Sequence, residues 1–280
     1  MRKKQKWFRK TIFFLAVGLV TFLVLFPYLW IVQLSFKTNT EIMTTPFSLP
    51  EVLSLDNYKR ALETLKLATM YGNTIYIALF ALFISVSFSF MSSYCISRLY
   101  FKNKKISNTI YLYFVAGLTI PSYIMIFPIY RITMSLKMMN SRWSLILPLA
   151  ATTLALDTLL FVGFLRNFPK EIEEAAIIDG CGIVRLCTRV VLPIIKPILA
   201  TVIVFNIIYF WNEYPISSVL INKEDMFTIS LSVSMFKGRY SMDYGGLIAA
   251  TVLITIPEII FYCFFQKYLV DGMTTGAIKG

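Results

Sequence analysis

Six long apolar stretches constrain this chain more than any other feature of its sequence. Each has about 20 residues or more, the length that an α-helix needs to cross the roughly 30 Å hydrocarbon core of a bilayer. The chain is 57 % hydrophobic and 15 % charged over 280 residues, which is too apolar for a water-soluble protein. We therefore expect an all-α integral membrane protein with six transmembrane helices. The predicted spans are residues 11–33, 73–95, 109–129, 143–165, 196–221 and 246–268.

The distribution of Lys and Arg predicts how these spans are oriented, because cytoplasmic loops carry an excess of basic residues. With the N-terminus inside, basic residues gather in the inner segments 2–10, 98–105 and 166–196, whereas the two longer outer loops also carry acids. Both termini are therefore expected in the cytoplasm. The first stretch is too long for the apolar core of a signal peptide and is interpreted as a retained helix. Orientation and anionic lipid explain the net charge of +12, so no nucleic-acid partner is expected.

Several classes of site lack the residues they would need. The chain has no histidine, and its four cysteines occur at unrelated spacings, so neither a metal site nor a disulfide framework is predicted. No phosphate-binding loop of the form GxxxxGK[ST] is present, so the chain is not expected to hydrolyse ATP. Residues 1–280 are expected to form a single membrane domain. The glycine-rich ending 271–280 is not expected to form a stable helix.

The charged loop 166–195 between two spans is too long for a simple connection and should have its own structure. Pro169 and the acids that follow it favour a helix start, and Gly180 suits the left-handed turn that ends a helix. After Gly182, apolar residues recur at helical spacing and predict a second, amphipathic helix. The pair could lie on lipid headgroups or dock a soluble partner. The small residues Ala175 and Ala176 favour docking, because they let another surface approach closely.

The sequence EEAAIIDGCGIVRLCTRVVLP, residues 173–193, resembles the Glu-Ala-Ala loop of permease subunits of bacterial ATP-binding cassette importers. The family pattern is EAA, three residues, G, nine residues, I, one residue, LP, and only Val190 departs from it. Further stretches resemble the carbohydrate branch, in particular its maltose-type smaller permease. These stretches are LFPYLWIVQLSFKTNTEI, LDNYKRAL, GLTIPSYIMIFPIYRI, FWNEY and YLVDGMTTGAIKG.

The resemblance implies the six-helix architecture of a type I importer in a bacterial cell (inner) membrane, with loop 166–195 containing a cytoplasmic coupling helix. It implies a second homologous permease, an ATPase dimer and an extracellular or periplasmic substrate-binding protein as partners. The chain itself should bind no cofactor, since ATP and Mg would lie on the ATPase. Members of the family commonly place an aromatic residue near Cys187, so Leu186 or Cys187 is expected to fill the ATPase groove. The predicted coupling residues are Glu174, Ala175, Ala176, Asp179, Gly180, Leu186, Cys187 and Pro193.

Ionisable residues at membrane depth are costly and often functional, which singles out Asp157, Glu213 and Glu258. Asp157 and Glu258 fall near the middle of their helices and could line a substrate path or bond the partner permease. The fifth span adds aromatic and amide groups of the kind that stack on a sugar ring and bond its hydroxyls. The candidate path residues are Asp157, Asn206, Tyr209, Trp211, Asn212, Glu213 and Glu258. Ordinary helix packing would explain the same residues.

We therefore expect a non-enzymatic permease subunit for a sugar or oligosaccharide. The same machinery could carry another solute, such as glycerol phosphate or a uronic-acid oligomer. A stand-alone secondary transporter would be expected to show an internal repeat and paired intramembrane charges, and neither is visible. A membrane enzyme is disfavoured because no nucleophile is paired with a base in the sequence.

Overall fold

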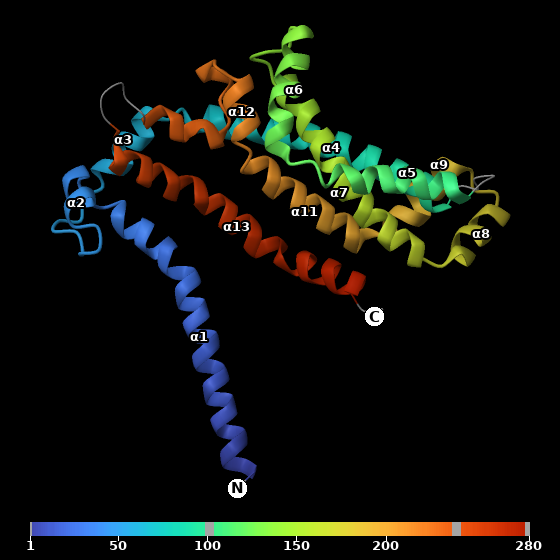
Figure 1. The fold of residues 1–280 in the computed structure, drawn as a ribbon, viewed down its shortest axis with the longest axis horizontal. Coiled ribbons are helices and arrows are strands. Elements are labelled where there is room, and N and C mark those ends of the chain that lie inside the picture. The colour runs from blue at the N-terminus through green and yellow to red at the C-terminus, as the bar shows by residue number, and fades with distance from the viewer. Residues whose placement is uncertain (1, 99–103, 237–241, 278–280) are drawn as a thin grey trace. The chain divides into compact units, whose positions relative to one another are not determined.

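The computed structural model describes residues 2–98, 104–236 and 242–277, and its elements are helices (Figure 1). Contacts between residues divide the chain into two compact units. The first comprises Met1–Lys66 with Ser232–Pro257, and the second comprises Leu67–Leu231 with Glu258–Gly280.

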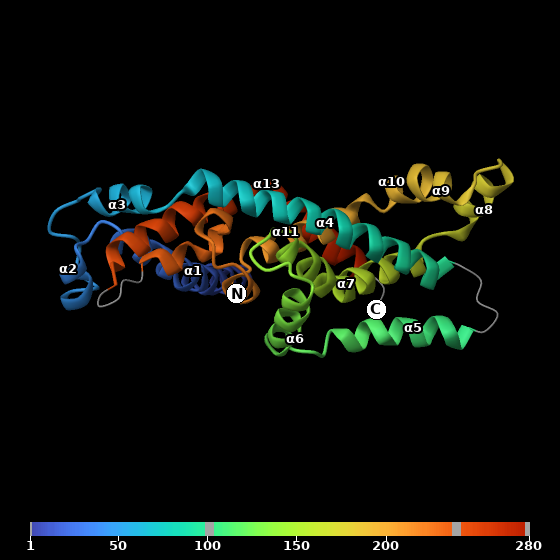
Figure 2. The same ribbon diagram turned by 90° about the horizontal axis from the view of Figure 1, so that it is seen from above.

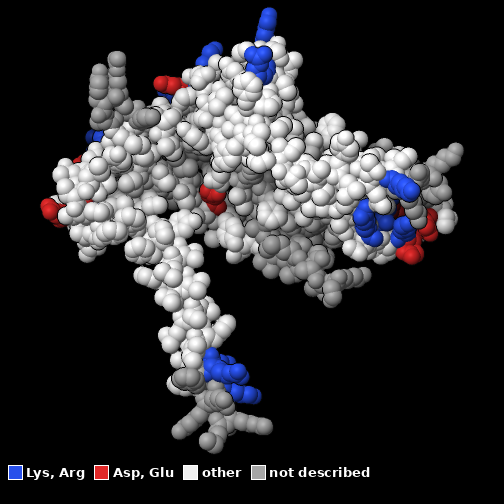
Figure 3. All heavy atoms as spheres, viewed as in Figure 1, with Lys and Arg blue, Asp and Glu red and all other residues white. Residues whose placement is uncertain are grey.

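The first unit contains the long helix α1 (Arg2–Leu34), two short helices, α2 (Asn39–Thr44) and α3 (Asp56–Thr64), part of the 3-10 segment η3 (Ile229–Phe236) and the first part of α13 (Tyr244–Ala277). None of the most apolar stretch of α1 is buried, so its Leu, Phe and Val side chains are presented along the whole span. In Figure 3 this helix is white for most of its length, with basic side chains near its N-terminal end.

A buried polar network ties the C-terminal end of α1 to α3 in the first unit. Asn57 on α3 donates its amide to the carbonyl oxygens of Ser35 and Lys37, each at 2.7 Å. Lys37 is itself buried and donates its ammonium group to the Thr45 carbonyl and the Ser48 hydroxyl. The side-chain oxygen of Asn57 lies so near Gly245 on α13 that a Cβ added to Gly245 would overlap this oxygen. These contacts require glycine at position 245.

The second unit is built around α4 (Leu67–Arg98) and α7 (Trp143–Asn167), which lie side by side (Figures 1 and 2). Serines 85, 89 and 93 of α4 are buried, and the Ser93 hydroxyl donates to the Thr158 carbonyl on α7 at 3.2 Å. Small side chains let two helices approach closely where lipid offers no hydrophobic drive to bring them together. The remaining helices of this unit are α5 (Lys104–Gly117), α6 (Ser122–Ser135), α8 (Lys170–Ile178), α9 (Ile183–Arg185), α10 (Leu192–Ile194), α11 (Lys196–Trp211) and α12 (Pro215–Leu220), with the π-helix η1 (Leu186–Val191) and the 3-10 helix η2 (Glu224–Met226).

The prediction of one continuous third span, 109–129, is wrong. The chain forms α5 and α6, which meet at a bend of 97°. Pro121 precedes α6 and has no N–H to continue the hydrogen-bond ladder of α5. The three N–H groups after Gly117 instead make tight turn bonds: Leu118 to the Val115 carbonyl, Thr119 to that of Ala116 and Ile120 to that of Gly117.

The fifth predicted span, 196–221, is also interrupted. Helix α11 ends at Trp211, and α12 begins at Pro215, which cannot donate to the Trp211 carbonyl. At the other end of α11, the segment Ile183–Ile194 meets it at a bend of 82°. Within the described residues, four helices are thus long and apolar enough to cross a membrane without a break, or up to six if each bent pair counts as one span.

Helix α13 continues to Ala277, so the expectation that residues 271–280 form no stable helix is wrong over the part of that stretch that the structure describes. A helix that is already nucleated gains one hydrogen bond for each residue added, which offsets the weak helix preference of glycine. Residues 278–280 lie outside the described part of the chain.

Because a Cβ at position 245 would overlap the Asn57 amide, Gly245→Ala should destabilise the first unit. Overpacking of this kind costs about 1–3 kcal/mol, so the thermal unfolding temperature of the purified chain should fall. Gly72→Ala is the matched control, because nothing lies within 4 Å of a Cβ at that helical position. Equal unfolding temperatures for Gly245→Ala and the wild type would contradict the close packing described here.

Candidate functional site

The predicted coupling segment begins with α8, which follows α7 after a two-residue connection. Pro169 precedes the helix in an extended conformation, and Glu171 and Glu173 lie in the first turn. Acids in a first turn interact favourably with the positive end of the helix dipole. In Figure 3 acidic and basic side chains gather at the end of the second unit that carries α8 and α9.

The turn after α8 has the geometry that the sequence predicts. Gly180 adopts φ of +81°, the left-handed conformation that glycine reaches without steric strain. Its N–H donates to the Ile177 carbonyl at 2.9 Å, and the Cys181 N–H donates to the Ala176 carbonyl at 3.0 Å. No atom lies within 4 Å of a Cβ built on Gly180, so only the backbone conformation demands glycine there.

The second half of the segment is helical but not one regular α-helix. It consists of α9, η1 and α10, and the Leu192 N–H donates to the carbonyl of Cys187, five residues earlier. Pro193 has no N–H for the carbonyl of Arg189, which favours the wider π-helical turn before it. The predicted amphipathic character is present, since Leu186 and Val191 are buried while Arg185 and Arg189 are exposed.

The predicted coupling residues divide between the surface and the interior of this chain. Glu174, Ala175, Asp179, Gly180 and Pro193 are exposed. Ala176 and Cys187 are half-buried against the apolar cluster that joins the segment to α4 and α7, and Leu186 is a member of that cluster with 2 % exposure. Burial raises the pKa of the Cys187 thiol, and the Glu173 carboxylate and Cys95 add to the rise. Leu186 therefore packs within its own chain.

The sequence did not predict the exposure of four apolar side chains around the Gly180 turn. Ile177 and Ile178 end α8, and Ile183 and Val184 begin the next helical segment. Ile178 is 85 % exposed and Val184 is 73 % exposed. The helical spacing after Gly182 predicts an apolar helix face but no exposed apolar surface around the turn. The break at Gly180 places them instead at the tip of the segment, and that glycine was the signal that could have identified them.

The intramembrane acids have three different environments. Asp157 is fully buried between helices of its own chain, where the Asn206 amide donates to its Oδ2 at 2.8 Å and to the Ser85 hydroxyl at 3.2 Å. Among the residues that the structure describes, the second oxygen, Oδ1, has no hydrogen-bond partner. Asp157 and Asn206 thus hold α7 against α11.

Glu213 acts on the backbone at the break in the fifth span. Its carboxylate accepts hydrogen bonds from the N–H groups of Ile216 and Ser217 at 2.6 and 2.9 Å and from the Ser217 hydroxyl at 2.5 Å. The side chain is buried, so these bonds satisfy the free N–H groups at the start of α12.

A cavity of about 260 Å³ opens beside this break. Tyr209, Asn212 and Glu213 line it from the α11 side, and Ser122 and Tyr123 line it from α6. The Asn212 amide donates to Glu258 Oε1 at 2.6 Å, which joins two predicted path residues. Trp211 faces Tyr71 instead, with ring centroids 5.8 Å apart.

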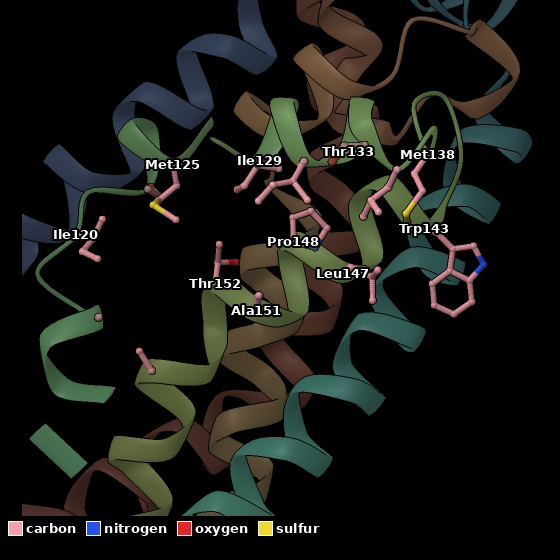
Figure 4. A pocket seen from close by; sticks show the side chains of 15 residues that line it. Ile120, Met125, Ile129, Thr133, Met138, Trp143, Leu147, Pro148, Ala151 and Thr152 are labelled. Atoms are coloured by element: carbon pink, nitrogen blue, oxygen red, sulfur yellow. The ribbon is translucent and has the colours of Figure 1, made fainter. Parts of the chain in front are cut away.

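A second cavity, of about 480 Å³, lies between the bent third span and α7 (Figure 4). Most of its lining side chains are apolar, such as Ile129 and Leu147, and Thr133 and Thr152 are among the few polar ones. Such a surface suits lipid or an apolar helix better than a polyhydroxylated solute.

Comparison with known proteins identifies the family. The profile of the family described as "Binding-protein-dependent transport system inner membrane component" matches residues 92–275. The diacetylchitobiose uptake system permease protein NgcG of Streptomyces coelicolor is 30 % identical, covering 92 % of this chain and 85 % of the relative. The probable starch degradation products transport system permease protein AmyC of Thermoanaerobacterium thermosulfurigenes is 32 % identical, covering 90 % of this chain and 91 % of the relative.

A solved structure shares the fold. It is a chain from a bacterial ABC transporter involved in the import of the acidic polysaccharide alginate, with a TM-score of 0.77 at 22 % identity, covering 92 % of this chain and 95 % of that chain. Together with the apolar helices, these matches show that the chain is a multi-pass membrane protein that belongs to the family of binding-protein-dependent transport system inner membrane components.

Proposed function

We propose that this chain is one permease subunit of an ATP-driven importer for a sugar or oligosaccharide. It pairs with a second homologous permease, receives solute from an extracellular or periplasmic binding protein and is driven by a separate ATPase dimer that holds ATP and Mg. Both termini lie in the cytoplasm, and this chain binds no cofactor. The observation that carries the proposal is the helix–glycine turn–helix segment 166–195, because such a segment has no evident role in a transporter that works alone.

The exposed tip of the segment supports docking to the ATPase. Ile178 and Val184 present apolar surface next to the exposed Glu174 and Asp179 carboxylates. An apolar centre with a charged rim is the usual composition of a protein–protein interface. We propose that Ile178 and Val184 fill the groove on the ATPase, a role for which the sequence had suggested Leu186 or Cys187.

Two measurements test the function. The first is co-purification of this chain with the second permease and the ATPase, and the second is solute uptake by vesicles that contain the complex. The binding protein should be assayed first, with neutral oligosaccharides, uronic-acid oligomers and glycerol phosphate as ligands. Binding and ATP-dependent uptake of a neutral sugar support the proposal. Uptake of only glycerol phosphate or a uronic-acid oligomer would replace the substrate class, and uptake without any ATPase would exclude an ATP-driven importer.

Ile178→Asp should weaken capture of the ATPase, because a carboxylate would be desolvated in an apolar groove. Ile172→Asp is the control, since residue 172 lies on the same helix about 120° around its axis from residue 178. The amount of ATPase that co-purifies with the membrane chains measures the effect. Equal capture by both variants would exclude Ile178 as an anchor.

Gly180→Val should uncouple hydrolysis from import while leaving membrane insertion intact. Valine in a left-handed conformation carries a strain of roughly 1–2 kcal/mol. The backbone turn at residue 180 should therefore change conformation and no longer orient the exposed Ile178 and Val184 side chains. Gly182→Val provides the control, because Gly182 has φ of −71° and open space around it. Import per ATP hydrolysed is the readout. Glu174→Lys, which reverses an exposed charge at the same surface, should act in the same direction; normal coupling in both Gly180→Val and Glu174→Lys would contradict the assignment.

We further propose that the solute passes the cavity lined by Tyr209, Asn212 and Glu213. Tyr209 offers an aromatic face, and the Asn212 side chain, whose amide also donates to Glu258, offers an amide donor and acceptor of the kind that sugar hydroxyls require. The Asp157–Asn206 pair lies buried behind this surface and fixes the helices that carry it.

Asn212→Ala should raise the substrate concentration needed for half-maximal import by about fivefold to tenfold, in line with the loss of one hydrogen bond between neutral groups. Basal ATP hydrolysis should remain unchanged, because the side chain lies far along α11 from the coupling segment. Asn222→Ala, an exposed position outside the cavity, controls for general effects of removing an amide. An unaltered half-maximal concentration in Asn212→Ala would exclude this path.

A further inference from the structure

A buried ion pair links the coupling segment to a second transmembrane helix. Arg98 is the last residue of α4, and Glu173 lies in the first turn of α8. The Arg98 Nε and Glu173 Oε1 atoms are 2.7 Å apart, and the two side chains are only 5 % and 8 % exposed. The two atoms are poorly aligned for a hydrogen bond, so charge attraction holds this contact.

Neighbouring groups fix both partners of the pair. The Tyr94 hydroxyl, one helical turn before Arg98 on α4, donates to Glu173 Oε2 at 2.8 Å. The Arg98 Nη2 donates to the Phe168 carbonyl at 2.7 Å, and the guanidinium lies over the Phe168 ring, 5.4 Å from its centroid. Phe168 belongs to the short connection between α7 and α8. Three segments therefore meet at one buried cation.

The helix ends favour these charges. A cation at the C-terminal end of α4 and an anion in the first turn of α8 both interact favourably with the helix dipoles. Moving the two buried charges apart costs free energy, because each charge would then be uncompensated. The ion pair thus opposes separation of the C-terminal end of α4 from the first turn of α8.

We propose that the Arg98–Glu173–Tyr94 link makes α4 move together with α8 when the ATPase displaces the coupling segment. Helix α8 is joined covalently to α7 through residues 168–169, and the ion pair gives it a second attachment, to α4. Arg98 and Glu173 are thus positioning residues. This inference rests on the proposed function of segment 166–195 as the site of ATPase docking.

The apolar contacts around the segment would not replace this link. Leu186 and Val191 pack with Phe90 and Phe161 in the cluster beneath the segment. Apolar burial is non-directional, so such surfaces can slide past each other with little change in free energy. The charge pair and the Tyr94 hydroxyl fix the position of the first turn of α8 along α4.

The test compares Glu173→Gln with Glu171→Gln in the full transporter reconstituted in vesicles. Glutamine keeps the shape of the side chain and removes its charge, and Glu171 is an exposed acid in the same helical turn. The Glu173→Gln complex should assemble and retain basal ATP hydrolysis, but its import per ATP hydrolysed should fall by about fivefold or more. Glu171→Gln should match the wild type. The double variant Arg98→Glu with Glu173→Arg should recover part of the loss.

A merely structural role would lower complex yield, hydrolysis and import in parallel and leave import per ATP unchanged, which would overturn the inference. Hydrogen exchange of the amides in residues 170–178 gives a readout that needs no transport. Glu173→Gln should accelerate exchange there and Glu171→Gln should not; equal exchange in both also overturns it. If the wild-type complex shows no ATP-driven import, the proposed function fails, whereas normal coupling in Glu173→Gln removes only the link described here.

Discussion

The need to pair every backbone N–H and C=O group in a bilayer determines how this chain can bend. An unpaired peptide group costs several kcal/mol in hydrocarbon, and yet two of the six apolar stretches are broken. Each break ends at a proline, Pro121 before α6 and Pro215 at the start of α12, and its backbone groups are satisfied locally. Turn bonds after Gly117 close the end of α5, and the Glu213 carboxylate binds the first N–H groups of α12. The breaks are therefore structured parts of the fold.

The same constraint explains where the polar side chains lie. Asp157 and Asn206 bond each other in the interior of the second unit, and serines line the contact between α4 and α7. The cavity next to α12 depends on the break in the fifth span. Residues on both sides of the break line it, Tyr209 and Asn212 before the turn and Pro215 after it, and an uninterrupted helix would have no such turn. Polar groups that shape the protein and the polar groups that we propose contact the solute thus occur within a few residues of each other.

The sequence predicted the apolar stretches and the helix–turn–helix structure of residues 166–195 well, because both depend on local patterns. Four of the six stretches lie within unbroken helices, and Gly180 has the left-handed turn that its place after an acidic helix predicts. The bend at Pro121 was missed because hydropathy is averaged over a window and does not register one missing N–H. Leu186 was assigned to the ATPase groove from the place of an aromatic residue in the resembling family, which does not say what covers this side chain here. Only the tertiary structure shows that α4 and α7 bury Leu186 and that Ile178 is exposed.

The bare surface of α1 has a consequence for how the protein is made. A helix whose peptide groups bond within the helix, and whose most apolar stretch is not buried by the described residues, does not need later segments in order to be stable in lipid. It can leave the insertion machinery as soon as it has been synthesised. Helix α4 differs, because Ser93 and Arg98 find their partners on α7 and α8, which emerge from the ribosome later. Until then these groups need water or an assisting protein, so synthesis between residues 98 and 173 is the stage at which the chain is most exposed to misassembly.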